Sequence, residues 1–126
     1  MSVIKVVCGL IWKGDALLIC RRKPGRSWGG FWEFPGGKIE MEETPVTALK
    51  RELIEELGMQ VSDICYQGQI LYHEESLSIE LIGCRCKFLS ATFELADHDD
   101  WKFVPFRDLH NYKLASADVM LLEKLF

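Results

Sequence analysis

The strongest local signal in this chain is a helix in residues 37–59, which read GKIEMEETPVTALKRELIEELGM. Thr44 suits the N-cap, because its hydroxyl can accept a hydrogen bond from the first turn, and Pro45 suits the first helical position. Gly58 suits the residue after the helix, where left-handed backbone is common. Apolar side chains form one stripe between these ends: Val46, Leu49, Leu53 and Leu57. We therefore predict a helix that packs this stripe against a sheet.

Three carboxylates lie beside the apolar stripe. Glu52, Glu55 and Glu56 have the spacing i, i+3 and i+4, so they occupy an arc of about 100° on the helix. The simpler interpretation is a solvated acidic face, although like charges at this spacing cost a few tenths of a kcal/mol per pair. The alternative is a site for hard divalent cations, which prefer carboxylate oxygens. Arg51 precedes Glu55 by four residues and could orient or partly neutralise the cluster.

The spacing of polar residues around this helix extends the pattern. Seven positions take part: Gly37, Glu43, Arg51, Glu52, Glu55, Glu56 and Gly58. Leu53 and Met59 fill its two apolar positions. This stretch, residues 37–59, resembles the Nudix box without a departure, and we refer to it below as the box. The resemblance favours the cation site over the solvated face.

Segments outside the box resemble the MutT-like, nucleotide-cleaving branch of the Nudix hydrolase family. They are residues 32–40, which read WEFPGGKIE, the pair Arg21-Arg22, and Ala117-Asp118. The resemblance implies an α+β fold, a mixed sheet sandwiched between helices, in one domain over residues 1–126. It also implies hydrolysis of a nucleoside triphosphate to a nucleoside monophosphate and pyrophosphate.

The resemblance further implies the cofactor and the residues that act with it. Mg²⁺, or Mn²⁺ in its place, would be bound by Glu52, Glu55, Glu56 and the Gly37 carbonyl. A bound metal ion lowers the pKa of water and neutralises charge that develops on a polyphosphate. The implied catalytic residues are Glu43, Arg51, Glu52, Glu55 and Glu56. We expect Glu43 to hold Arg51 or a ligand in place from behind the metal.

The general base is open between several carboxylates. Glu55 or Glu56 can take the proton from water, but in some relatives an acid from a later loop does so. Asp97, Asp99 and Asp100 are the loop candidates here, where many MutT-like sequences carry glutamate. A solvated acidic turn explains these aspartates equally well.

Four residues are candidates for substrate binding. The guanidinium of Arg22 suits phosphate oxygens, and Lys38 follows the glycine turn and could also reach a phosphate. Asp118 occupies the position where the resemblance places a base-contacting Asn or Asp. However, Ser116 is a good helix N-cap, and an acid two residues later is favourable for the helix dipole alone. Phe34 either lines the base pocket or belongs to the core.

The rest of the chain reads as strands and one closing helix. Strands are expected at residues 3–12, 16–20, 61–71, 77–89 and 101–104, with turns at 35–37 and 97–100. In the closing helix, Val119, Leu122 and Phe126 are expected to face inward. Strands and helices alternate without βαβ regularity, which is typical of α+β folds.

Composition limits the class of protein. The chain has 126 residues and a net charge of −4, which argues against a general nucleic-acid or membrane-surface binder. Its five cysteines form no metal-binding spacing and are expected to be reduced, buried thiols. No signal-length apolar segment follows the N-terminus, so we expect a cytoplasmic protein, monomeric or homodimeric, without a stable nucleic-acid partner.

Several functions remain open from the sequence. Within triphosphate hydrolysis, the substrate is either an oxidised purine nucleotide such as 8-oxo-dGTP, in nucleotide-pool sanitising, or a CTP-like pyrimidine nucleotide. A more distant alternative is cleavage of a dinucleotide, a nucleotide sugar or capped RNA. A nucleotide-binding module without turnover would be expected to lose box glutamates, and here Glu43, Glu52, Glu55 and Glu56 are all present.

Overall fold

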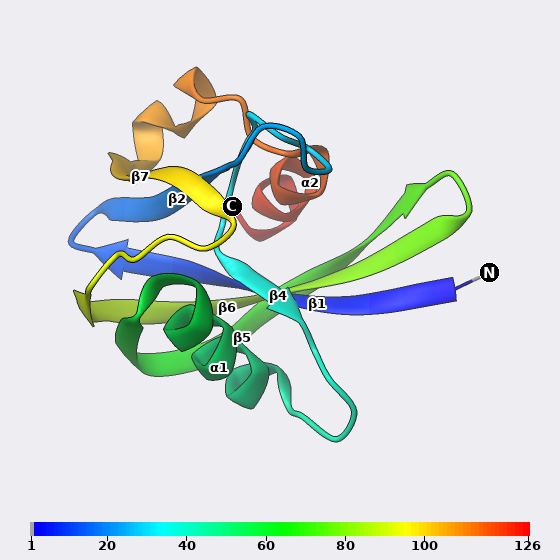
Figure 1. The fold of residues 1–126 in the computed structure, drawn as a ribbon, viewed down its shortest axis with the longest axis horizontal. Helices are drawn as coiled ribbons and strands as arrows, with labels where there is room; N and C mark the ends of the chain where they lie inside the picture. Colours follow the sequence, from blue (N-terminus) through cyan, green and yellow to red (C-terminus); the bar gives the residue numbers. More distant parts are fainter. Residues whose placement is uncertain (1) are drawn as a thin grey trace.

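The computed structural model describes residues 2–126, which form a mixed sheet with helices packed on it (Figure 1). The strands are β1 Ser2–Lys13, β2 Ala16–Arg22, β3 Trp32–Glu33, β4 Gly36–Lys38, β5 Met59–Glu74, β6 Leu77–Ala91 and β7 His98–Pro105. The helices are α1 Pro45–Leu57, the 3-10 helix η1 Phe106–Asn111 and α2 Ser116–Leu125. Within this part of the chain, no helix has the length and apolar character needed to cross a membrane.

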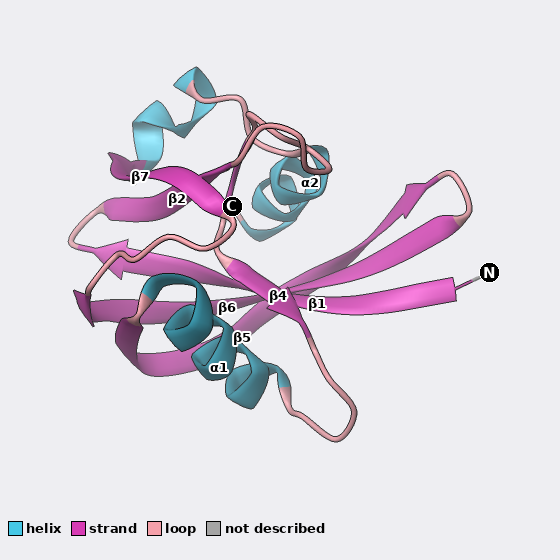
Figure 2. Ribbon diagram, viewed as in Figure 1, coloured by secondary structure: helices cyan, strands magenta, loops and turns pink. Residues whose placement is uncertain are grey.

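The sheet combines parallel and antiparallel pairs, as expected from the sequence (Figure 2). Its strands follow the order β3-β2-β1-β6-β5, while β4 pairs with β1 and β7 pairs with β2. β1 and β6 run parallel from Ser2↔Leu77 to Trp12↔Lys87, whereas β5 and β6 are antiparallel. The predicted mixed-sheet α+β fold is confirmed.

Helix α1 begins and ends as the sequence predicts. The Thr47 N–H donates to Thr44 Oγ1 at 3.1 Å, and Pro45 is the first helical residue. At the other end Gly58 has φ 56°, in the left-handed region, and its N–H donates to the Ile54 carbonyl at 3.0 Å. Local sequence therefore determines both ends of the helix that carries the box carboxylates.

Helices α1 and α2 pack on opposite faces of the sheet. Leu53 of α1 shares a core with Ile82 and other even-numbered residues of β6. Leu121 of α2 shares a second core with Leu81, and it lies against Gly83. Side chains of a strand alternate between its two faces, so the sheet is covered on both sides.

Two predicted turns are partly strands. Gly36 and Gly37 belong to β4, because they pair with Cys8 and Val7 of the central strand. The acidic segment at 97–100 enters β7 at His98, which pairs with Arg22. In both places, pairing with a distant strand overrides local turn preference.

The inward face of α2 also differs from the prediction. Ala115, not Ser116, is the N-cap, and no side chain caps this helix. Asp118 and Leu121 are buried, whereas Val119 and Phe126 are exposed. Because each residue advances a helix by about 100°, the buried face of α2 is shifted by about one residue from the face predicted by the sequence.

The cysteines are free thiols, and four of the five are buried. The expectation was wrong for Cys65, which is exposed on β5.

Candidate active site

Arg51 is the centre of the polar network on α1. Its Nε and Nη2 donate to the two carboxylate oxygens of Glu43, both at 2.8 Å. Its Nη1 donates to Glu52 Oε1 at 2.9 Å and to Glu55 Oε2 at 3.2 Å. Nη2 also donates to the Lys38 carbonyl at 3.1 Å, which ties the helix to the end of β4. The hydrogen bonds from Arg51, and a further one from the Glu40 N–H, lower the pKa of Glu43 to about 2.

Gly37 leaves room for the Glu52 carboxylate. A Cβ at position 37 would collide with the carboxyl atoms of Glu52, so any other residue there would displace this carboxylate. Partial burial raises the pKa of Glu52, although its hydrogen bond from Arg51 acts in the opposite direction. The Glu52 carboxylate is therefore held in a narrow space against the backbone.

Glu56 is hydrogen-bonded to Asp97, whereas Arg51 donates to Glu43, Glu52 and Glu55. Burial raises the pKa of Glu56 to about 7, and its hydrogen bond with Asp97 and the charge of Asp97 act in the same direction. The hydrogen bond from Glu56 and the nearby Arg26 lower the pKa of Asp97, so Glu56 is the member that holds the shared proton. Glu56 Oε2 is buried and has no hydrogen-bond partner among residues 2–126.

Only one of the three loop aspartates contacts the box. Asp97 pairs with Glu56 and lies 3.1 Å from Nη1 of Arg26. Asp99 instead accepts a hydrogen bond from Arg21 Nε at 2.8 Å, and Asp100 accepts one from the Trp101 N–H at 2.8 Å. Among these three candidates, the geometry singles out Asp97.

The chemistry of the box fits a hard divalent cation. All of its candidate ligands are oxygen donors, Glu56 Oε2 lacks a partner, and Gly37 keeps space open beside Glu52. In the described residues 2–126, no three His, Cys, Asp or Glu side chains are arranged so that they could hold a metal ion. The reason is visible in the contacts, because Arg51 holds Glu52 and Glu55 while Glu56 pairs with Asp97.

A cavity of about 160 Å³ is lined by residues of β1, β2, β3, β5, β6 and α2. Its polar lining includes Arg22, Ser27, Glu33, Tyr72 and Asp118. Arg22 Nη1 donates to Glu33 Oε2 at 3.1 Å, and its Nε donates to the Ser27 carbonyl at 2.8 Å. The predicted Arg22 and Asp118 are therefore brought together, although 96 residues separate them in sequence.

Asp118 is a buried acid at the wall of this cavity. Its side chain is only 6% exposed, and its Oδ2 accepts a hydrogen bond from the Phe34 N–H at 2.7 Å. Burial raises the pKa of Asp118 to about 8, helped by the negative charge of Glu33. Near neutral pH this group is a neutral acid, so it can donate a hydrogen bond as well as accept one.

Two of the predicted substrate residues lie elsewhere. The Phe34 ring is 3% exposed and packs in the core with Leu10 and Leu121, so only its backbone touches Asp118. Lys38 is exposed and lines a different cavity beside Lys5 and Glu43. The structure does not bring either side chain to the Arg22 cavity.

Sequence reasoning missed the residues that link the cavity to the box. Glu33 accepts hydrogen bonds from both Arg22 and His98, whose Nε2 lies 2.8 Å from Glu33 Oε2. His98 is 2% exposed and follows Asp97, the partner of Glu56. Sequence spacing gave no signal for His98, because its contact with Glu33 arises from β3 and β7 lying on either side of β2.

Comparisons with known proteins agree with this geometry. The family model described as "NUDIX domain" matches residues 6–124. A CTP pyrophosphohydrolase from Escherichia coli (strain K12) is 32% identical over 126 residues, which cover 98% of this chain and 91% of that protein.

A further relative and a solved structure support the same family. An 8-oxo-dGTP diphosphatase from Proteus vulgaris is 49% identical over 57 residues, which cover 45% of this chain and 48% of that protein. The crystal structure of a MutT protein from Methanosarcina mazei Go1 matches with a TM-score of 0.82 and 26% identity, covering 98% of this chain and 92% of that one. The box, the sheet topology and these matches together show that the chain belongs to the Nudix hydrolase family.

Proposed function

We propose that this protein is a Mg²⁺-dependent pyrophosphohydrolase that converts a nucleoside triphosphate to a nucleoside monophosphate and pyrophosphate. The observation that carries the proposal is the short series of residues that connects the box to the Arg22 cavity. Glu56 pairs with Asp97, the neighbouring His98 binds Glu33, and Glu33 binds Arg22. A nucleotide in the cavity would thus have its phosphates close to the box.

The metal ion in this proposal belongs to the box. Glu52, Glu55, Glu56 and the Gly37 carbonyl would hold Mg²⁺, with Mn²⁺ as an alternative ion. When bound, it supplies an activated water and neutralises charge on the phosphates. Arg51 now holds Glu52 and Glu55, so both carboxylates would have to turn from its guanidinium to hold the cation.

Side chains of the protein accept the proton from water and orient the catalytic groups and the phosphates. Glu56 is the candidate general base because its carboxyl is hydrogen-bonded to Asp97. Its pKa is about 7 without a cation in the box, and a bound cation would lower this pKa and favour the carboxylate that accepts a proton. Asp97 orients the Glu56 carboxyl, and Glu43 fixes Arg51 through two hydrogen bonds. Arg22 supplies a positive charge and a hydrogen-bonding fork for the phosphates.

Asp118 is the residue proposed to read the base. As a neutral acid it can pair with a base edge that presents both a donor and an acceptor, which cytosine and guanine derivatives both do. The relatives named for CTP and for 8-oxo-dGTP support the same two substrates, so these remain the two candidates. Other nucleoside diphosphate derivatives are the alternative within the family.

The proposal also includes the setting of the enzyme. We place it in the cytoplasm as a single domain, a monomer or homodimer, that acts on small nucleotides and forms no stable nucleic-acid complex.

A nucleotide panel tests the proposal. Canonical triphosphates, 8-oxo-dGTP, a dinucleotide and a nucleotide sugar are each assayed with Mg²⁺, Mn²⁺ and chelator, with pyrophosphate and phosphate release measured separately. We expect pyrophosphate release from CTP-like or oxidised purine triphosphates, and none with chelator. Faster cleavage of the dinucleotide or the sugar would reject triphosphate hydrolysis, and turnover in chelator would reject the metal requirement.

A further inference from the structure

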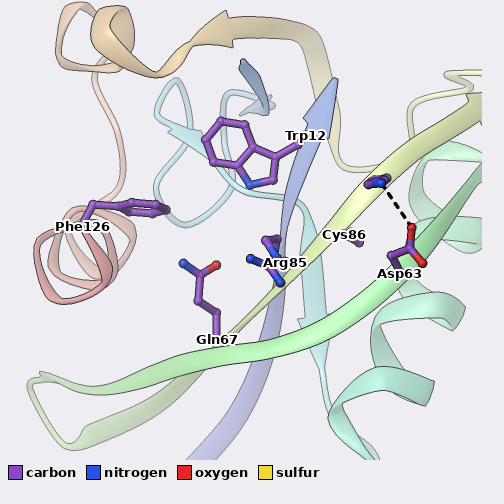
Figure 3. Close-up of a pocket in the computed structure, with 7 residues that line it drawn as sticks. Trp12, Asp63, Gln67, Arg85, Cys86 and Phe126 are labelled. Atoms are coloured by element: carbon purple, nitrogen blue, oxygen red, sulfur yellow. Dashed lines mark ion pairs between the residues drawn. The ribbon is translucent and has the colours of Figure 1, made fainter. Parts of the chain in front are cut away.

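We propose that a second cavity, distant from the box, binds a nucleoside monophosphate (Figure 3). This second cavity measures about 670 Å³, within the range of about 300–1,000 Å³ typical of small-molecule sites. Its lining includes Trp12, Gln67, Arg85, Lys87 and Phe126. None of these residues belongs to the box or lines the Arg22 cavity.

The second cavity is on the same face of the sheet as the Arg22 cavity, with α2 between them. Ile79 and Leu81 of β6 line the Arg22 cavity, and Gly83 lies under Leu121 of α2. Arg85 is the next residue on the same face and lines the second cavity. A ligand at either site can therefore be bound without displacing the other.

The charged side chains that line the second cavity are Arg85, Lys87 and Asp63, so the lining has an excess of one positive charge, although the chain as a whole carries a net charge of −4. Arg85 is exposed, and in residues 2–126 its guanidinium has no ion-pair or hydrogen-bond partner. Lys87 lies on the same face of β6, and its Nζ is 3.6 Å from an oxygen of Asp63. Since Lys87 is paired with Asp63, the free guanidinium of Arg85 is the group that suits a phosphate.

Aromatic rings form another part of the lining. Trp12 and Phe126 have ring centroids 6.4 Å apart at an interplanar angle of 73°, so the two rings are in edge-to-face contact. Phe126 is 54% exposed, although its ring also contacts Phe106 at a centroid distance of 4.8 Å, so part of its surface is open to a ligand. Planar bases stack on such surfaces, and this favours a ligand that joins a base to a phosphate.

Gln67 offers a hydrogen-bond acceptor to a ligand in the second cavity. Its Oε1 is buried and has no partner in the part of the chain that the structure describes. Buried amide oxygens are nearly always satisfied, and this one lies in the lining of the second cavity beside Trp12 and Arg85 (Figure 3). An exocyclic amine or ring N–H of a base can supply the donor, whereas the fully ionised phosphate monoester of a nucleotide cannot.

Amide NMR of the full chain tests this proposal with AMP and CMP as probes, in chelator so that the box metal is not involved. We expect shifts at Trp12, Gln67 and Arg85 that saturate independently of any shifts near Arg22. Arg85→Ala should weaken this binding about 10-fold or more while leaving triphosphate hydrolysis unchanged. The matched control is Arg107→Ala, another exposed arginine, which lies outside the cavity.

Three results would overturn the proposal. Shifts confined to residues around Arg22 and Asp118 would show a single nucleotide site. Equal affinity of the Arg85→Ala and Arg107→Ala variants would show that Arg85 does not bind the nucleotide. Binding of inorganic phosphate as tight as that of AMP and CMP would show that the base takes no part in binding. Since hydrolysis is measured separately, each result is distinguishable from failure of the proposed function.

Discussion

At the scale of single residues, Arg51 explains how α1 tolerates clustered carboxylates. One guanidinium contacts Glu43, Glu52 and Glu55, so like-charge repulsion on the exposed helix face is offset locally. Glu56 lies outside this arrangement and pairs with Asp97 instead. The four glutamates therefore have different environments, which is what different chemical roles require.

Glu56→Gln should stop turnover without unfolding the protein. The amide can no longer take a proton, so we expect kcat to fall about 10²–10⁴-fold, as is typical when a general base is lost. Circular dichroism and thermal melting should show an intact fold. Glu123→Gln on the exposed side of α2 is the control and should keep full activity. Unchanged turnover in both Glu55→Gln and Glu56→Gln would refute the assignment of the box.

Arg22→Ala should act mainly on substrate binding. Arg22 lines the cavity, whereas its neighbour Arg21 pairs with Asp99 and lies over the Trp32 ring. We expect KM to rise about 10-fold or more, from loss of a charged hydrogen bond, with a smaller change in kcat. Arg21→Ala should leave KM nearly unchanged in the same assay. The opposite ranking would assign phosphate binding to Arg21.

Asp118→Asn should stabilise the protein increasingly as pH rises. The pKa of Asp118 is about 8 in the fold, above the usual value of about 4 for an unfolded aspartate. Between these values the folded state binds the extra proton, so the contribution of Asp118 to stability is full below pH ~4 and is lost as pH rises through ~8.

Asparagine keeps an acceptor for the Phe34 N–H but does not ionise. The variant and the wild type should therefore unfold at similar urea concentrations near pH 4 and differ by on the order of a few kcal/mol near pH 8. A difference in unfolding free energy that stays constant over this range would show that Asp118 titrates normally.

At the scale of elements, the end of α1 depends on Gly58. Its φ of 56° disfavours any other residue, and a Cβ there would collide with Thr92 Oγ1. Gly58→Ala should destabilise the fold by about 1–3 kcal/mol. Gly14→Ala is a matched comparison, because Gly14 has φ 62° but a Cβ at that position would meet no atom within 4 Å. Denaturant unfolding should give Gly58→Ala the larger cost, and equal costs would exclude the contact with Thr92.

At the scale of the whole molecule, α2 connects the second core to the Arg22 cavity. Leu121 is fully buried against Gly83, and Asp118 is one turn earlier on the same side of the helix. Leu121→Ala should cost about 2–5 kcal/mol and also raise KM, because it loosens the helix that carries Asp118. Met120→Ala, on the half-exposed side, should cost about 1 kcal/mol or less by the same unfolding measurement. Comparable losses of unfolding free energy in Leu121→Ala and Met120→Ala would contradict the packing of Leu121 against Gly83.

Prediction from sequence succeeded where local interactions decide the outcome. The caps of α1 are set within one helical turn, and the long strands follow from their apolar runs. Prediction from sequence failed where a segment pairs with a strand that is distant in sequence. The glycines of β4 and the acidic start of β7 look like turns locally, but pairing with β1 and β2 makes them strands.

The site divides in the same way. Sequence alone determined the carboxylate face of α1 and its family, because helix geometry converts fixed spacing into a shared face. Only the tertiary structure decided that Asp97 pairs with Glu56, that His98 and Glu33 connect the box to Arg22, and that Asp118 is a buried acid. Those contacts join β2, β3, β7 and the two helices, and no local periodicity encodes how such elements meet.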